Sequence, residues 1–236
     1  MATWWERVSA VAPAPDLALV VVVAFLAFAA TSAPGAWRRT RHLVTIAHEG
    51  AHGVAALASG RRLAGIRLHS DTSGLTVSVG RDRGLGMVFT AAAGYVGPAV
   101  IGLLAAVLLS HGHAVGVLWA LLVLLGLLVL QIRNFFGLWV VLLAGAGLVV
   151  VTRWLSTEAQ LVIAYAVTWF LLLGAPRAVV ELQRERRRRG GRERTSDAAT
   201  LARLTRLPAV VWVGFFLAVT VGCLLLGGRL LLVAAA

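Results

Sequence analysis

The composition of this 236-residue chain is that of a membrane protein. Apolar residues make up 59% of it, and they occur in runs long enough to cross a bilayer, which excludes an ordinary soluble domain. The net charge of +12 comes from arginine alone, and the arginines lie between the apolar runs, so we expect no nucleic-acid partner. The lone cysteine, Cys223, excludes an intrachain disulfide and a cysteine-rich metal cluster.

Uncharged stretches of about 20 residues predict one integral membrane domain, residues 1–236, that crosses the bilayer seven times. The expected fold class is an all-α membrane protein, a polytopic helical bundle with a small β-hairpin after the second span. The spans are expected at Leu17–Ala33, Leu43–Ser59, Gly84–Leu109, Ala114–Leu130, Phe135–Val151, Ala159–Ala175 and Leu207–Leu226. The second span is unusual, because His48, Glu49 and His52 interrupt it and His42 directly precedes it.

The first span also resembles the apolar core of a cleaved signal peptide. Leu17–Ala29 is followed by small residues, but Arg7 is balanced by Glu6 and Asp16, so the positive excess of a signal peptide is missing. We therefore expect this span to be retained.

The hairpin is predicted over residues 61–80, where the pattern changes from helical to alternating. Ile66–His69 and Leu75–Val79 flank the turn-forming residues Asp71–Gly74. Two roles are open for it: a small structured loop, or a strand edge offered to an extended peptide.

The arginines predict the orientation of the chain. A cytoplasmic hairpin also places Arg133, Arg177 and a basic loop, residues 182–198, in the cytoplasm, as the positive-inside rule favours. The N-terminus is then cytoplasmic and the C-terminus outside. Four arginines violate the rule by lying outside: Arg38, Arg39, Arg41 and Arg153.

The residues His48-Glu49-Gly50-Ala51-His52 match the pattern HExxH. Two histidines four residues apart project from one face of a helix and can bind one zinc ion, and Glu49 can activate the zinc-bound water as a general base. A random chain of this composition would contain roughly 0.004 such matches. Ionisable residues inside a membrane helix are functional candidates, although histidines that hydrogen-bond between packed helices are the alternative.

A catalytic zinc usually has a third protein ligand, and the predicted orientation limits the candidates. His111 and His113 lie in an outer loop, about a membrane thickness of ~30 Å from His52, and are excluded. The inner candidates are His69, Asp71, Glu181 and Asp197. We choose Asp197, which begins a plausible helix after Ser196, and ordinary helix capping is its alternative role.

Asn134 follows Arg133 at the inner start of the fifth span. It is a candidate substrate-binding or oxyanion residue, and helix capping is again the alternative.

The chain resembles the site-2-protease-like intramembrane zinc metallopeptidases, in particular their compact bacterial members. The resemblance covers most of the chain from Arg38 onward. It rests on four segments: HEGAH at 48–52, the hairpin segment 62–69, the helix with Ala93-Gly94-Tyr95-Val96-Gly97-Pro98, and Ser196-Asp197-Ala198 near the last span.

The resemblance implies a multi-pass protein of a bacterial cell membrane that holds one Zn²⁺ per chain. It implies His48, His52 and Asp197 as zinc ligands, Glu49 as the base, and a membrane-embedded protein substrate unwound beside the hairpin. Family members usually present the aspartate in an Asp-Gly context, whereas Ala198 follows Asp197 here. A non-catalytic membrane scaffold is the alternative function. A transporter is disfavoured, because no internal repeat is apparent.

Overall fold

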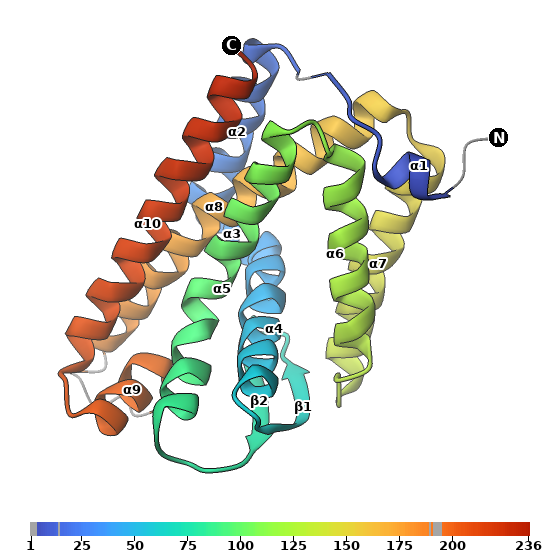
Figure 1. The fold of residues 1–236 in the computed structure, drawn as a ribbon. Helices are drawn as coiled ribbons and strands as arrows, with labels where there is room; N and C mark the ends of the chain where they lie inside the picture. The colour runs from blue at the N-terminus through green and yellow to red at the C-terminus, as the bar shows by residue number, and fades with distance from the viewer. Residues whose placement is uncertain (1–3, 14, 189, 191–194) are drawn as a thin grey trace.

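The computed structural model describes residues 4–13, 15–188, 190 and 195–236, and most of these are helical (Figure 1). The elements in chain order are α1 (Trp4–Val8), α2 (Leu17–Ser32), α3 (Pro34–Thr40), α4 (His42–Ala58), β1 (Arg62–Leu68), β2 (Gly74–Val79), α5 (Leu85–Ser110), α6 (Ala114–Val129), α7 (Phe135–Trp154), α8 (Thr157–Arg188), α9 (Asp197–Thr205) and α10 (Ala209–Ala234).

The predicted β-hairpin is confirmed. β1 and β2 pair antiparallel from Arg62 opposite Val79 to Leu68 opposite Gly74, with a bulge between Leu63 and Gly65. The hairpin packs on α4, and its tip is tied to that helix by Thr45, whose hydroxyl donates to the carbonyl of Thr72 at 2.9 Å.

The predicted count of seven spans is not confirmed. Among the described residues, four helices are long and apolar enough to cross a membrane: α5, α7, α8 and α10. The bent pair α2 and α3 would make a fifth, and α6 is a shorter apolar helix. The second and fourth predicted spans correspond to α4 and α6, of 17 and 16 residues. At 1.5 Å per residue these reach only about 24–26 Å, short of the ~30 Å hydrocarbon core.

A bend between α2 and α3 also changes the predicted orientation of the N-terminal part. Pro34 starts a new helix, α3, at 95° to α2. The chain therefore runs across the direction of α2 before it enters α4. The start of α4 then lies beside α8, where Arg41 is 3.2 Å from Glu181. The sequence had placed these two residues on opposite sides of the membrane, so the two assignments cannot both hold.

The N-terminal segment lies at the opposite end of the bundle from the hairpin. The backbone N–H of Ala12 donates to the carbonyl of Gly112, in the loop between α5 and α6, at 2.9 Å. Figure 1 shows the start of α2 near the C-terminus, at this same end. The expectation of an N-terminus on the hairpin side is therefore corrected.

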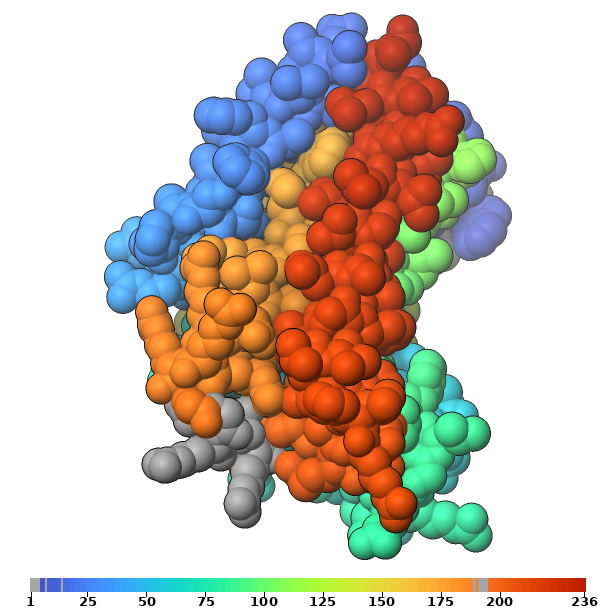
Figure 2. Space-filling model, turned by 90° about the vertical axis from the view of Figure 1, so that its left-hand side faces the viewer, coloured from blue at the N-terminus to red at the C-terminus, as the bar shows by residue number. Residues whose placement is uncertain are grey.

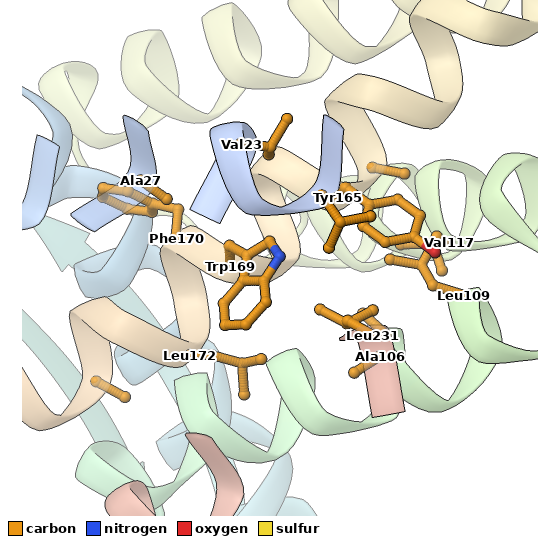
Figure 3. Close-up of a cluster of buried hydrophobic side chains, with 14 of the residues drawn as sticks. Val23, Ala27, Ala106, Leu109, Val117, Tyr165, Trp169, Phe170, Leu172 and Leu231 are labelled. Carbon is orange, nitrogen blue, oxygen red and sulfur yellow. The ribbon is translucent and has the colours of Figure 1, made fainter. Parts of the chain in front are cut away.

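The main apolar core lies between α2, α5, α6, α8 and α10 (Figure 3). Leu172 of α8 is fully buried there. An added Cβ would lie 3.0 Å from Leu172 Cγ at Gly102 and 2.8 Å from its Cδ1 at Gly227. These two glycines let α5 and α10 approach α8 closely, as small residues do in membrane helix packing.

Large apolar side chains also cover the outside of the bundle. Figure 2 shows α2 and α10 along one face with α8 between them. Exposed apolar residues on the two outer helices include Val21, Val22, Phe25, Leu26, Val210, Val211, Leu225 and Leu226. A continuous apolar exterior suits lipid rather than water, which identifies a membrane protein.

The predicted basic loop is helical in its first part. α8 continues to Arg188, and its 32 residues reach about 48 Å, so the arginine-rich end extends beyond the hydrocarbon region. Residues 189 and 191–194 lie outside the described residues.

Candidate metal centre

The two histidines of α4 and Asp197 of α9 bring three ligand atoms together. The Nε2 atoms of His48 and His52 lie 3.1 Å apart, and Asp197 Oδ2 lies 3.2 Å from each of them. Ligand atoms bound to one tetrahedral zinc at ~2.0–2.1 Å are about 3.3 Å apart. The three atoms therefore match one face of a zinc coordination shell.

Helix α9 carries Asp197 to this position. Its apolar side packs on α5 and α10, where Ala198 and Leu201 are buried with Phe216. The Ser196 hydroxyl caps the helix by accepting from the N–H of Ala199 at 3.3 Å. Because Ser196 caps the helix, the Asp197 carboxylate can point to the histidines.

Helix α5 orients His52 and leaves room for an ion. The Nδ1 atom of His52 lies 2.7 Å from the carbonyl oxygen of Thr90, which fixes the proton on Nδ1 and leaves the Nε2 lone pair for a metal. A Cβ added at Gly94 would lie only 2.3 Å from His52 Nε2, and one at Gly97 only 2.2 Å from the Ala51 Cβ. Glycine is therefore required at both positions for α5 to approach α4 this closely.

The donor set fits zinc. Two imidazole nitrogens and one carboxylate oxygen are ordinary zinc ligands and leave a fourth position open, as in catalytic sites. Asp197 Oδ2 is buried and accepts no hydrogen bond from the described residues. With the proton of His52 on Nδ1, its Nε2 lone pair faces this carboxylate oxygen. A cation between them relieves that repulsion and supplies the missing partner.

The ligand atoms of His48, His52 and Asp197 form a triangle, here called the ligand triangle. Glu49 is held next to this triangle but does not belong to it. Its side chain is buried, and its Oε2 accepts a hydrogen bond of 2.6 Å from the Thr76 hydroxyl of β2. A Cβ added at Gly74 would lie 2.4 Å from Glu49 Oε1. The carboxylate thus lies between α4 and the first residues of β2, where it suits a base rather than a ligand.

A cavity of about 810 Å³ opens onto these residues. It is lined by α4, the inner face of β2, α5, α8 and the start of α9. Glu181 on its wall accepts a hydrogen bond from Trp37 Nε1 at 2.8 Å and lies 3.2 Å from Arg41 and 3.7 Å from Arg177. The contacts of Trp37 and Arg41 tie α3 and the start of α4 to α8, so charged as well as apolar contacts hold this wall of the cavity.

The other candidates for the third ligand are engaged elsewhere. Glu181 is occupied by the contacts just described. Asp71 accepts two hydrogen bonds from Ser73 in the exposed hairpin turn, and these lower the pKa of the Asp71 carboxyl group. His69 lies 3.3 Å from the same serine hydroxyl. Neither hairpin residue belongs to the ligand triangle.

Asn134 lies at the hairpin and does not line the cavity. Its Nδ2 donates to the carbonyl of Leu68 at 2.7 Å, and its Oδ1 accepts from the N–H of Leu68 at 3.1 Å. It occupies the N-cap position of α7 without a capping hydrogen bond from its side chain. The neighbouring residues Gln131 and Arg133 pair with Ile66, so this loop extends the hairpin along the outer edge of β1.

Sequence reasoning did not find Thr76, Thr90, Gly94 or Tyr95 as parts of the site. The Tyr95 ring lies edge-on to His48 at 4.7 Å and stacks on Phe216 at 5.2 Å. The glycine and tyrosine belong to a segment that the family resemblance already included. The sequence placed Thr76 in the second strand and Gly74 in the turn before it, and it did not indicate that both would face Glu49.

The chain was compared with curated proteins, solved structures and models of protein families. No curated protein and no solved structure matches the chain. The model of the family described as peptidase M50B-like, which is the site-2-protease family, matches residues 18–227 and so includes every residue of the metal centre. The chain therefore belongs to the peptidase M50B-like family of membrane proteases.

Proposed function

We propose that the protein is a zinc-dependent intramembrane endopeptidase that hydrolyses a peptide bond of a membrane-embedded protein. The observation that carries the proposal is the triangle of His48, His52 and Asp197, with Glu49 buried beside it. Family membership supports the protease class.

The residues divide the chemistry between them. His48, His52 and Asp197 would hold one zinc ion, which supplies a Lewis acid for the scissile carbonyl and makes water more acidic. Glu49 takes the proton from the attacking water and returns it to the leaving amine. Its carboxylate is oriented for this by the hydrogen bond from Thr76.

The substrate is proposed to bind in extended form along β2. The outer edge of β1 is covered by residues 131–134, and among the described residues β2 pairs only with β1. A membrane helix must unwind before a protease can reach its peptide bonds, and a sheet edge satisfies the freed backbone groups. The inner face of β2 lines the cavity, so the bound strand lies close to the metal centre.

We infer that the hairpin, α9 and the arginine-rich end of α8 face the cytoplasm. In this arrangement α2, α3 and α4 together cross the bilayer once. Arg38, Arg39 and Arg41 then lie within this crossing and no longer in an outer loop, which removes three of the four violations of the positive-inside rule, while Arg7 moves to the outer side with α1. Both Leu17 and the C-terminal end of α10 lie outside.

The test uses the full chain, purified in detergent, and single-span reporter proteins with helix-destabilising residues near the cytoplasmic end of the span. We expect about one zinc per chain, cleavage of at least one reporter, and no cleavage by Glu49→Gln with its zinc retained. Cleavage by Glu49→Gln at the wild-type rate would contradict the proposal. A wild-type chain that cleaves none of the reporters would favour the scaffold function.

A further inference from the structure

The hairpin strand β2 contacts the proposed base directly. The Thr76 hydroxyl lies 2.6 Å from Glu49 Oε2 and 3.1 Å from the backbone carbonyl oxygen of Glu49. A hydrogen bond of this length from a hydroxyl to a carboxylate is charge-assisted and roughly twice as strong as a neutral one. It fixes one oxygen of a side chain that otherwise rotates about several bonds.

The second oxygen of Glu49 is fixed by the shape of the same strand. Oε1 lies against Gly74, where any Cβ would come within 2.4 Å of it and within 2.6 Å of Glu49 Cδ. Alternation along β2 turns Gly74 and Thr76 toward α4, whereas Leu75 and Val77 are exposed on the other face. Both contacts to the carboxylate therefore come from one face of one strand.

The position of Thr76 is in turn determined by contacts that do not involve Glu49. The Thr45 hydroxyl holds the hairpin tip to α4, and the Asn134 amide holds β1 from the other side. Because of these anchors, the Thr76 hydroxyl is presented to Glu49 by a fixed strand. The same strand is the proposed binding edge for the substrate.

We propose that Thr76 is a positioning residue for Glu49, so that β2 orients the general base as well as binding the substrate. This inference rests on the proposed function. It assigns the hairpin a role in the chemical step, and it predicts an effect on kcat without an effect on KM. Loss of the Thr76 hydroxyl should slow the reaction and leave substrate binding unchanged, since that hydroxyl faces the base and not the open edge.

The test compares three variants of the full chain, and one control variant, on the reporter that the wild type cleaves best. Thr76→Val keeps the shape and removes the hydroxyl, and its kcat should fall about 10–100-fold with KM within about 2-fold, as expected for a misplaced general base. Thr76→Ser restores the hydroxyl and should recover at least about a third of the wild-type kcat. Gly74→Ala displaces Oε1 and should also lower kcat. Zinc content should stay near one per chain in all three variants.

Thr45→Val is the matched control for loosening of the hairpin. It also removes a threonine hydroxyl bond between α4 and the hairpin, but this hydroxyl bonds to the carbonyls of Thr72 and Arg41 and not to Glu49. Its kcat should fall less than about 3-fold, because the Asn134 amide and the pairing of β2 with β1 still hold the strand in place. The inference is overturned if Thr76→Val keeps its kcat, if Thr76→Ser is as impaired as Thr76→Val, or if Thr45→Val is impaired equally.

The two proposals fail in different ways. If Glu49→Gln cleaves the reporter or the wild type does not, the proposed function fails and this inference fails with it. If the wild type cleaves and Glu49→Gln does not, a normal Thr76→Val overturns the positioning role alone.

Discussion

The apolar core and the hairpin end of the molecule are stabilised by different interactions. The core between α2, α5, α6, α8 and α10 consists of many apolar contacts (Figure 3). The hairpin end depends on a few side chains that each make a specific contact, such as Asp197 with two histidines. Substitutions in the core should therefore lower the stability of the fold, whereas substitutions at the hairpin end should weaken metal binding.

Replacement of Asp197 should have the largest effect. Asp197→Ala removes one of three protein ligands, and even loss of an outer-shell partner typically weakens metal binding ~10–100-fold, so zinc affinity should fall by more than ~100-fold and cleavage should vanish. The core does not contact this carboxylate, so the melting temperature of the metal-free protein should change little. Metal titration and calorimetry in detergent measure the two effects.

Asp71→Ala is the matched control, because it removes an exposed carboxylate of the hairpin turn that is engaged with Ser73. It should bind zinc as the wild type does. Equal zinc affinity in Asp197→Ala and the wild type would exclude Asp197 as a ligand.

Gly94→Ala should also abolish zinc binding, although it adds only a methyl group. The new Cβ would lie 2.3 Å from His52 Nε2, inside the space that the ion requires. Gly126→Ala in α6 is the control, since a Cβ there meets nothing within 4 Å and alanine favours a helix. If Gly94→Ala binds one zinc with wild-type affinity, the ion is not bound where the triangle places it.

Leu172→Ala tests the apolar core. Leu172 is fully buried against Gly102 and Gly227, and truncation of a buried leucine typically costs about 2–5 kcal/mol. The free energy of unfolding should fall by this amount, while the folded fraction still binds one zinc per chain. Leu142→Ala, on the exposed side of α7, should change stability far less. A variant that keeps its stability but loses zinc would show that core and site are not separate.

Sequence patterns predicted the parts of the molecule that local rules determine. The HExxH spacing placed His48 and His52 on one face of a helix, and alternation around Asp71–Gly74 predicted the hairpin. Asp197 was chosen from a helix start and the predicted sidedness, and the structure brings it to the histidines.

The remaining features depend on long-range packing that a single sequence does not encode in a local pattern. The sequence predicted a first span that ends at Ala33, but not the 95° bend at Pro34 that brings Arg41 to Glu181 and reverses the side assigned to the N-terminus. Apolar length alone overestimated the spans, because α4 and α6 end where the hairpin and its neighbouring loop begin. The contact of Thr76 with Glu49 depends on how the hairpin docks on α4.

Replacement of Asn134 should have the smallest and most local effect of these substitutions. Its amide pairs with both backbone groups of Leu68, so Asn134→Ala leaves an N–H and a carbonyl without these partners, at about 1–3 kcal/mol for each buried group left unpaired. Hydrogen exchange at the Leu68 amide should become faster, zinc should be retained, and cleavage should fall because β2 moves with β1. Asn134→Asp keeps the acceptor for the Leu68 N–H but places a carboxylate against the Leu68 carbonyl, so it should be at least as impaired as alanine. If instead Asn134 contacts the substrate or the oxyanion, kcat will fall while exchange at Leu68 stays at the wild-type rate, and the two measurements together separate an anchor of the hairpin from a residue of the reaction.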